Sequence, residues 1–289
     1  MASSSDTALT LEQARYLYSR ERATFDRVLE IARRADESRV KAATLLASAA
    51  EVHLTKAYLH GIALGKILPA VPGPTSQLHD FPSAAVLVRS LAETYLAFRY
   101  ACVEPKTQED IDFRDALMYY HYLYKRNSTL DSWSADDALK KKIRQKLDRA
   151  KERLKANPVF AAQCESDRKH QLSGRTAFHR DLPDIVKEAG ITPKLWTSFW
   201  IFLSQFEHSS PMAIINMRDF RADDPLGPYN LAYLADMASC FLARFTWDLS
   251  NLFRQKKPAF EIDDVQLLME RMLRLERAKP VEVPDVSTY

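Results

Sequence analysis

The chain has 289 residues, of which 46% are hydrophobic and 27% are charged, a composition typical of a folded globular protein and not of a disordered one. Its 41 Lys and Arg residues against 38 Asp and Glu residues give a formal net charge of +3, which is too small to indicate nucleic-acid binding without further evidence. There are 6 glycines, where average usage predicts roughly 20. This argues against a glycine-rich phosphate loop, a dinucleotide-binding turn and a turn-dense β-sandwich.

The first half of the sequence predicts a series of long helices. Apolar residues recur at three- and four-residue steps over residues 10–34, and a helix rich in small residues follows to about residue 68. The proline-rich segment 69–82 interrupts this pattern and is a candidate joint. After it, further helices are predicted at about 83–103, 110–127 and 135–156.

The second half continues the helical pattern after an irregular stretch at 169–193. Helices are predicted at about 193–208, 229–254 and 262–278, and no run of alternating apolar and polar residues indicates a strand. The sequence therefore predicts an all-α protein, a compact multi-helix bundle without significant sheet. We expect a single helical domain over 1–279 and a loose C-terminal tail over 280–289.

The sequence lacks several motifs that would indicate secretion, membrane insertion or metal binding. The three cysteines lie far apart, and the N-terminal residues contain no apolar run of the kind found in secretory signals. No segment reaches the roughly 18–20 apolar residues of a membrane span. Neither the HExxH nor the CxxC pattern occurs. We therefore expect a cytoplasmic protein that has no membrane partner and needs no metal or cofactor.

Two pairs of polar residues are the first candidates for a site. Arg89 and Glu93 are four residues apart on a helix with apolar neighbours, so they share a face and can pair. They form either a buried ion pair that fixes packing or the lining of a polar pocket. Ser204 and His208 have the same spacing at the end of an aromatic helix. His208 either interacts with the helix C-terminal dipole or faces Glu93 across that pocket.

The two motifs Arg-x3-Glu and Ser-x3-His-Ser, in this order, resemble a bacterial family known only as a domain of unknown function. The resemblance covers roughly residues 40–250 and implies an all-helical fold and a shared polar site, but no activity. On this basis we expect an intracellular bacterial protein that binds a small anionic or nucleotide-like ligand in a stress or defence system. Glu93 and His208 are then the catalytic candidates, and Arg89 and Ser204 are ligand-binding candidates.

A second pattern supports an alternative function. Arg114 is followed seven positions later by His121, which resembles, more weakly, the Arg-x(4–6)-His motif of HEPN-type ribonucleases. Those proteins are helical bundles that often act as dimers in toxin and phage-defence systems. The resemblance implies metal-independent RNA cleavage, a homodimer and an RNA partner. Arg114 would stabilise charge on the scissile phosphate and His121 would transfer a proton.

Two cationic segments remain open to several interpretations. Residues 168–180 contain six cationic or titratable groups, including Arg175 and His179, and form either an anion-binding loop or a solvated one. Residues 136–155 contain nine Lys or Arg and four Asp or Glu residues, a net charge of +5. The charged side of this helix is exposed to solvent, binds RNA or mediates self-association.

A third alternative for the function of the whole protein is a non-enzymatic interaction module. The sequence does not decide whether the protein is an enzyme.

Overall fold

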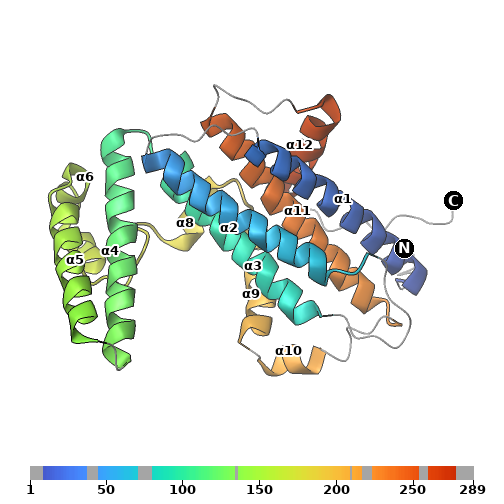
Figure 1. Ribbon diagram of the computed structural model, residues 1–289. Coiled ribbons are helices and arrows are strands. Elements are labelled where there is room, and N and C mark those ends of the chain that lie inside the picture. Colours follow the sequence, from blue (N-terminus) through green and yellow to red (C-terminus); the bar gives the residue numbers. More distant parts are fainter. Residues whose placement is uncertain are drawn as a thin grey trace, which may run out of the picture. The chain divides into compact units, whose positions relative to one another are not determined.

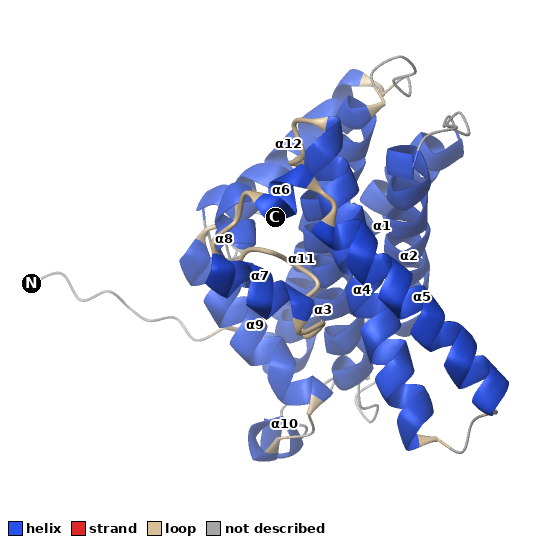
Figure 2. Cartoon of the chain, turned by 90° about the vertical axis from the view of Figure 1, so that its left-hand side faces the viewer, coloured by secondary structure: helices blue, strands red, loops and turns tan. Residues whose placement is uncertain are grey.

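The computed structural model describes residues 9–37, 45–70, 80–133, 136–208, 210–216, 223–253 and 260–277. Nearly all of these residues are helical, and none of them lies in a strand (Figures 1 and 2). The prediction of an all-α fold is therefore confirmed. The helices are α1 (Leu11–Glu37), α2 (Leu45–Ile67), α3 (Phe81–Phe98), the π-helix η1 (Arg99–Val103), α4 (Gln108–Ser132), α5 (Asp137–Lys155), α6 (Pro158–Ala161), α7 (Glu165–Leu172), α8 (Leu182–Glu188), α9 (Pro193–Glu207), α10 (Pro211–Asn216), α11 (Leu226–Leu252) and α12 (Ile262–Arg277).

Local sequence signals set several of the helix ends. At the start of α1, Thr10 and Gln13 exchange hydrogen bonds between side chain and backbone, at 2.9 and 3.2 Å, which forms a capping box. The side chain of Asp136 accepts a hydrogen bond from the Leu139 N–H and caps α5. Gly174 and Gly190 follow the last turns of α7 and α8 with φ of 70° and 71°, a conformation that glycine adopts at helix C-termini.

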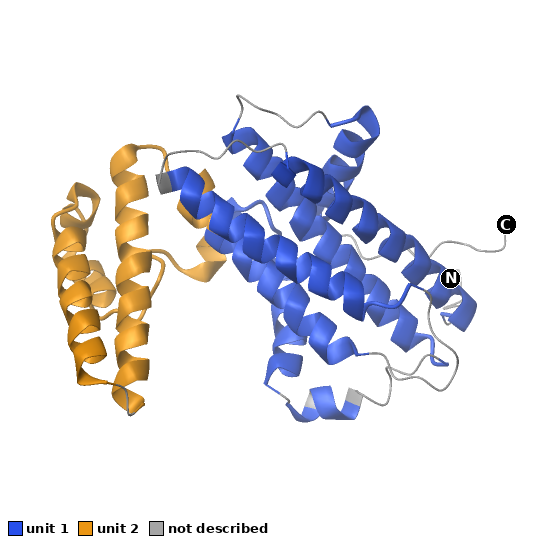
Figure 3. Ribbon diagram, in the orientation of Figure 1, with its two compact units in different colours: residues 1–97, 186–289 blue, residues 98–185 orange. Residues whose placement is uncertain are grey.

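The chain divides into two compact units (Figure 3). Unit 1 comprises residues 1–97 and 186–289, and unit 2 comprises residues 98–185. The single domain predicted over 1–279 stays a prediction. Most of the predicted joint at 69–82, and the whole of the predicted tail at 280–289, lie outside the described residues.

Unit 1 is organised around α11, which is buried along most of its length. The most extensive helix–helix contact among the described residues joins α1 to α11, and both α2 and α12 also pack on these two helices. Gly61 of α2 allows a close approach, because a Cβ atom there would lie 2.8 Å from Leu29 Cδ1 of α1. Helix α3 joins the same core, where the Tyr95 ring contacts Phe241 and Phe245 of α11.

Unit 2 is built on the helical hairpin of α4 and α5. Its core consists of buried residues from both helices and from α6: Phe113, Ala116, Leu117, Tyr120, Leu123, Ala150, Leu154 and Phe160. The narrow apolar stripe of α5 is thus turned into α4, which leaves the cationic side chains of α5 at the surface. None of the described helices is both long enough and apolar enough to cross a membrane.

Candidate functional site

Helices α3 and α9 bring four of the predicted site residues into one neighbourhood of unit 1. Arg89 Nε donates a hydrogen bond to Glu93 Oε1 at 3.1 Å, as the four-residue spacing predicts. The Arg89 side chain is 12% exposed, whereas that of Glu93 is 46% exposed. The pair is therefore buried only on the arginine side. The Ser204 hydroxyl donates to the Trp200 carbonyl oxygen at 2.6 Å, within its own helix.

The residue that connects this cluster is Glu207, which the sequence analysis did not single out. Arg89 Nη1 donates to Glu207 Oε2, and His208 Nε2 lies 3.4 Å from the same oxygen. The Arg89 guanidinium also lies over the Trp200 ring, 4.0 Å from its centroid. No hydrogen bond joins Glu93 to His208 among the described residues. Glu207 lies seven residues after Trp200, so helical spacing places these two residues on one face of α9, but only the fold brings that face to Arg89 of α3.

In unit 2, the guanidinium of Arg114 is engaged by several buried or partly buried groups. It donates to both carboxylate oxygens of Asp110, at 2.8 and 3.1 Å, and to the Tyr100 carbonyl oxygen at 2.6 Å. It also donates to Glu104, at 3.1 Å, and lies over the Tyr100 ring. Only 7% of the Arg114 side chain is exposed. In this conformation Arg114 holds η1 against α4, and it must release a partner before it can bind a phosphate.

His121, His179 and Arg175 also lie in unit 2. His121 Nδ1 is 2.9 Å from the Gly174 carbonyl oxygen; since that oxygen can only accept, Nδ1 carries the proton and Nε2 stays available. His179 Nδ1 is 2.7 Å from the Tyr100 hydroxyl, and burial raises the pKa of that hydroxyl. Arg175 is exposed, and its backbone N–H donates to the Ser173 hydroxyl. The ribonuclease role of Arg114 and His121 stays a prediction.

A buried network of charges, absent from the sequence analysis, links α1, α11 and α12 in unit 1. Arg271 Nη1 donates to Glu21 Oε2 at 2.6 Å and to Asp236 Oδ1 at 2.7 Å. Both carboxylate side chains are at most 1% exposed. Arg20 Nη2 lies 2.7 Å from Glu21 Oε1, and Arg274 Nε lies 3.1 Å from Asp236 Oδ1. Burial raises the pKa of the Asp236 carboxyl above its ordinary value, against the opposing effect of the two α12 arginines.

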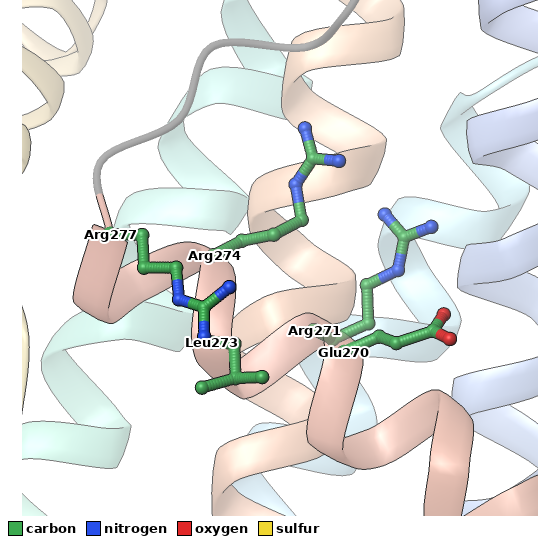
Figure 4. A pocket seen from close by; sticks show the side chains of 5 residues that line it. All are labelled: Glu270, Arg271, Leu273, Arg274 and Arg277. Atoms are coloured by element: carbon green, nitrogen blue, oxygen red, sulfur yellow. The ribbon is translucent and has the colours of Figure 1, made fainter.

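A pocket of about 270 Å³ adjoins this network along α12. Figure 4 shows the Arg271 and Arg274 side chains extending from the helix in the same direction, whereas Glu270 points away from Arg274. Arg274 Nη2 is buried and has no hydrogen-bond partner among the described residues. The full lining is Glu270, Arg271, Leu273, Arg274 and Arg277. The three arginines are spaced by three residues, a signal that the sequence offers.

Residues 76–225 match the model of a family of unknown function, DUF5677. The chain belongs to this family. The DUF5677 region contains the cluster around Arg89 and all of unit 2, whereas the α12 pocket lies outside it. The resemblance to a family of unknown function is therefore confirmed, while its motifs and the ribonuclease resemblance stay predictions. No curated protein and no solved structure matches the chain.

Within the part of the chain that the structure describes, no group of three or more His, Cys, Asp or Glu side chains could hold a metal ion. What the described sites do offer is arginine, which binds carboxylate and phosphate oxygens in a planar fork.

Proposed function

We propose that the protein binds a small oxyanion, such as phosphate or a small phosphorylated molecule, in the α12 pocket. The observation that carries the proposal is that three arginines line one pocket of about 270 Å³. This volume lies below the roughly 300–1,000 Å³ typical of sites for drug-sized ligands, which favours a small ligand. Glu270 is the one acidic residue of the lining, and it accepts a hydrogen bond from Gln266 at 3.1 Å.

The three arginines of the pocket differ in how free they are to bind. Arg271 is engaged by Glu21 and Asp236, so its charge is already compensated within the buried network. Arg274 Nε lies 3.1 Å from Asp236 Oδ1, but its buried Nη2 has no hydrogen-bond partner among the described residues, which costs free energy until an acceptor satisfies it. Arg277 is exposed and has no ion-pair partner among the described residues. Arg274 and Arg277 are therefore the groups that hold the anion.

The two other candidate places are less suited to an anion. Arg89 already binds two carboxylates, so an anion must displace Glu93 or Glu207. These carboxylates are 46% and 41% exposed, and ion pairs at such exposure contribute only about 0–1 kcal/mol, so the displacement is feasible but not free. A larger pocket of about 540 Å³ lies on α2, but its Lys56 is balanced by Glu51 in the same lining.

A thermal-shift titration tests the proposal. Phosphate, pyrophosphate and sulfate are added at constant ionic strength, with chloride as the reference anion. A ligand at 100 times its Kd stabilises the folded state by about 2.7 kcal/mol, and we expect at least one oxyanion to raise the melting temperature. Arg274→Gln and Arg277→Gln should abolish the increase, and Arg89→Gln, the matched control, should retain it.

Two results would count against the proposal. If no oxyanion stabilises the protein beyond chloride, the pocket does not bind this ligand class. If Arg89→Gln abolishes the stabilisation while Arg277→Gln retains it, the anion binds on α3 and α9, and the α12 assignment is wrong.

A further inference from the structure

The hairpin of α4 and α5 in unit 2 carries an exposed row of side chains on each helix. Asp115 on α4 pairs with Arg153 near the end of α5 at 2.9 Å, and Asp131 near the end of α4 pairs with Arg144 in the first half of α5 at 2.9 Å. The two helices therefore run antiparallel. Asp115 and Arg153 lie on the same side of the hairpin because they form an ion pair. Residues at three- and four-residue steps after Asp115 on α4 and before Arg153 on α5 therefore share this face.

The row on α4 is aromatic. Tyr119 and Tyr122 lie one turn apart, are 40% and 48% exposed, and stack with a centroid distance of 6.2 Å and an interplanar angle of 27°. Arg126, one turn further, donates a hydrogen bond to the Tyr122 hydroxyl at 2.6 Å. Its guanidinium lies 5.9 Å from the centroid of the same ring. The sequence places two exposed aromatic rings and one cation on this side of α4.

The row on α5 is cationic. Lys142, Lys146 and Arg149 precede Arg153 at the same four-, three- and four-residue steps that separate the members of the α4 row. All three side chains are exposed and have no ion-pair partner among the described residues. With Arg126, they give the face four uncompensated positive charges, because Arg153 is balanced by Asp115. Each row, from 115 to 126 on α4 and from 142 to 153 on α5, extends over about 16 Å of helix.

We propose that this face binds single-stranded nucleic acid. Proteins that bind single strands combine a positively charged track for the phosphates with aromatic rings on which bases stack. The face holds both, with the cations of α5 facing the phosphates and the tyrosines of α4 facing the bases. An amphipathic helix that binds a membrane surface buries its apolar stripe in the lipid. The stripe of α5 is instead buried against α4, which favours nucleic acid over lipid.

Fluorescence anisotropy of the full chain tests the proposal, with 20-nucleotide oligouridylate and oligodeoxythymidylate as probes. We expect both to bind, and a duplex of the same length to bind more weakly because its bases are not free to stack. Lys146→Gln/Arg149→Gln should lower the magnitude of the slope of log K against log salt concentration by about 1.4. The control Lys141→Gln/Lys155→Gln removes two charges that lie roughly 110° and 150° around the same helix from the mean direction of Lys146 and Arg149, and it should leave the slope unchanged.

A second pair of variants tests the tyrosines. Tyr119→Ala/Tyr122→Ala should weaken binding by about fivefold or more for each base that stacks. Both side chains are exposed, so the fold should persist, as checked by circular dichroism. Tyr122→Phe removes the hydroxyl that accepts from Arg126 but keeps the ring, and should bind like the wild type. The difference between the affinities for oligouridylate and oligodeoxythymidylate shows whether the face prefers RNA or DNA.

Three outcomes would overturn the proposal. The first is an equal loss of affinity in the two double charge variants, which would mean a non-specific response to net charge. The second is unchanged affinity after both tyrosines are replaced by alanine. The third is binding to phosphatidylserine vesicles without binding to either single strand, which would assign the face to a membrane.

Discussion

Replacing Arg271 with methionine should destabilise unit 1 strongly, because this arginine compensates two buried carboxylates at once. Its Nη1 lies 2.6 Å from Glu21 and 2.7 Å from Asp236, and neither carboxylate side chain is more than 1% exposed. Removing one partner of a buried ion pair typically costs about 3–5 kcal/mol. Each carboxylate retains a second arginine, Arg20 for Glu21 and Arg274 for Asp236, so we expect a loss of about 3 kcal/mol, at the lower end of this range.

Urea unfolding followed by circular dichroism measures this loss, with Arg277→Met as the matched control on the same helix. Arg277 is exposed, so its replacement should change the unfolding free energy by no more than about 0.5 kcal/mol. The loss caused by Arg271→Met should shrink as the pH falls toward 4.5. Burial already raises the pKa of Asp236, and without Arg271 this carboxyl can take up a proton and become neutral. A loss below about 1 kcal/mol, or one independent of pH, would refute the reasoning.

The remaining predictions concern three other residues. Glu93→Ala should change the unfolding free energy by less than about 1 kcal/mol, because the Glu93 side chain is 46% exposed; a loss of 3 kcal/mol in urea unfolding would show a desolvated pair. If the protein cleaves RNA as the weaker resemblance implies, His121→Ala should abolish cleavage in a gel assay and EDTA should not inhibit it; dependence on Mg²⁺ would contradict this. Burial raises the pKa of Asp264, but hydrogen bonds from two α1 arginines hold it below its ordinary value. The unfolded state therefore binds more protons near pH 4, and Asp264→Asn should flatten the fall in stability there, as measured by urea unfolding across pH.

The helices follow closely from local sequence. Apolar spacing predicts α1 and most later helices to within a few residues, and the structure adds caps such as Thr10 with Gln13. The π-helix at Arg99–Val103 was expected as a continuation of α3, because its apolar pattern does not distinguish the two kinds of turn. What local sequence cannot supply is the proximity of distant elements, as in unit 1, where α1 and α12 meet.

The same difference between local and long-range contacts explains which parts of the candidate sites the sequence predicts. The Arg89–Glu93 pair follows from its four-residue spacing, whereas the contact between Arg89 and Glu207 joins residues 118 positions apart. Arg271 meets its partner Glu21 across 250 positions. The sequence analysis did not single out the arginines of α12, because nothing in their own helix indicates that one of them neutralises buried carboxylates.

The most direct test of anion binding at α12 is a crystal structure of the protein grown or soaked with selenate, an oxyanion whose selenium is located by anomalous scattering. We predict an anomalous peak in the α12 pocket, with selenate oxygens within hydrogen-bond distance of Arg274 and Arg277. A peak beside Arg89 with none at α12, or no ordered selenate in the molecule, would contradict the assignment.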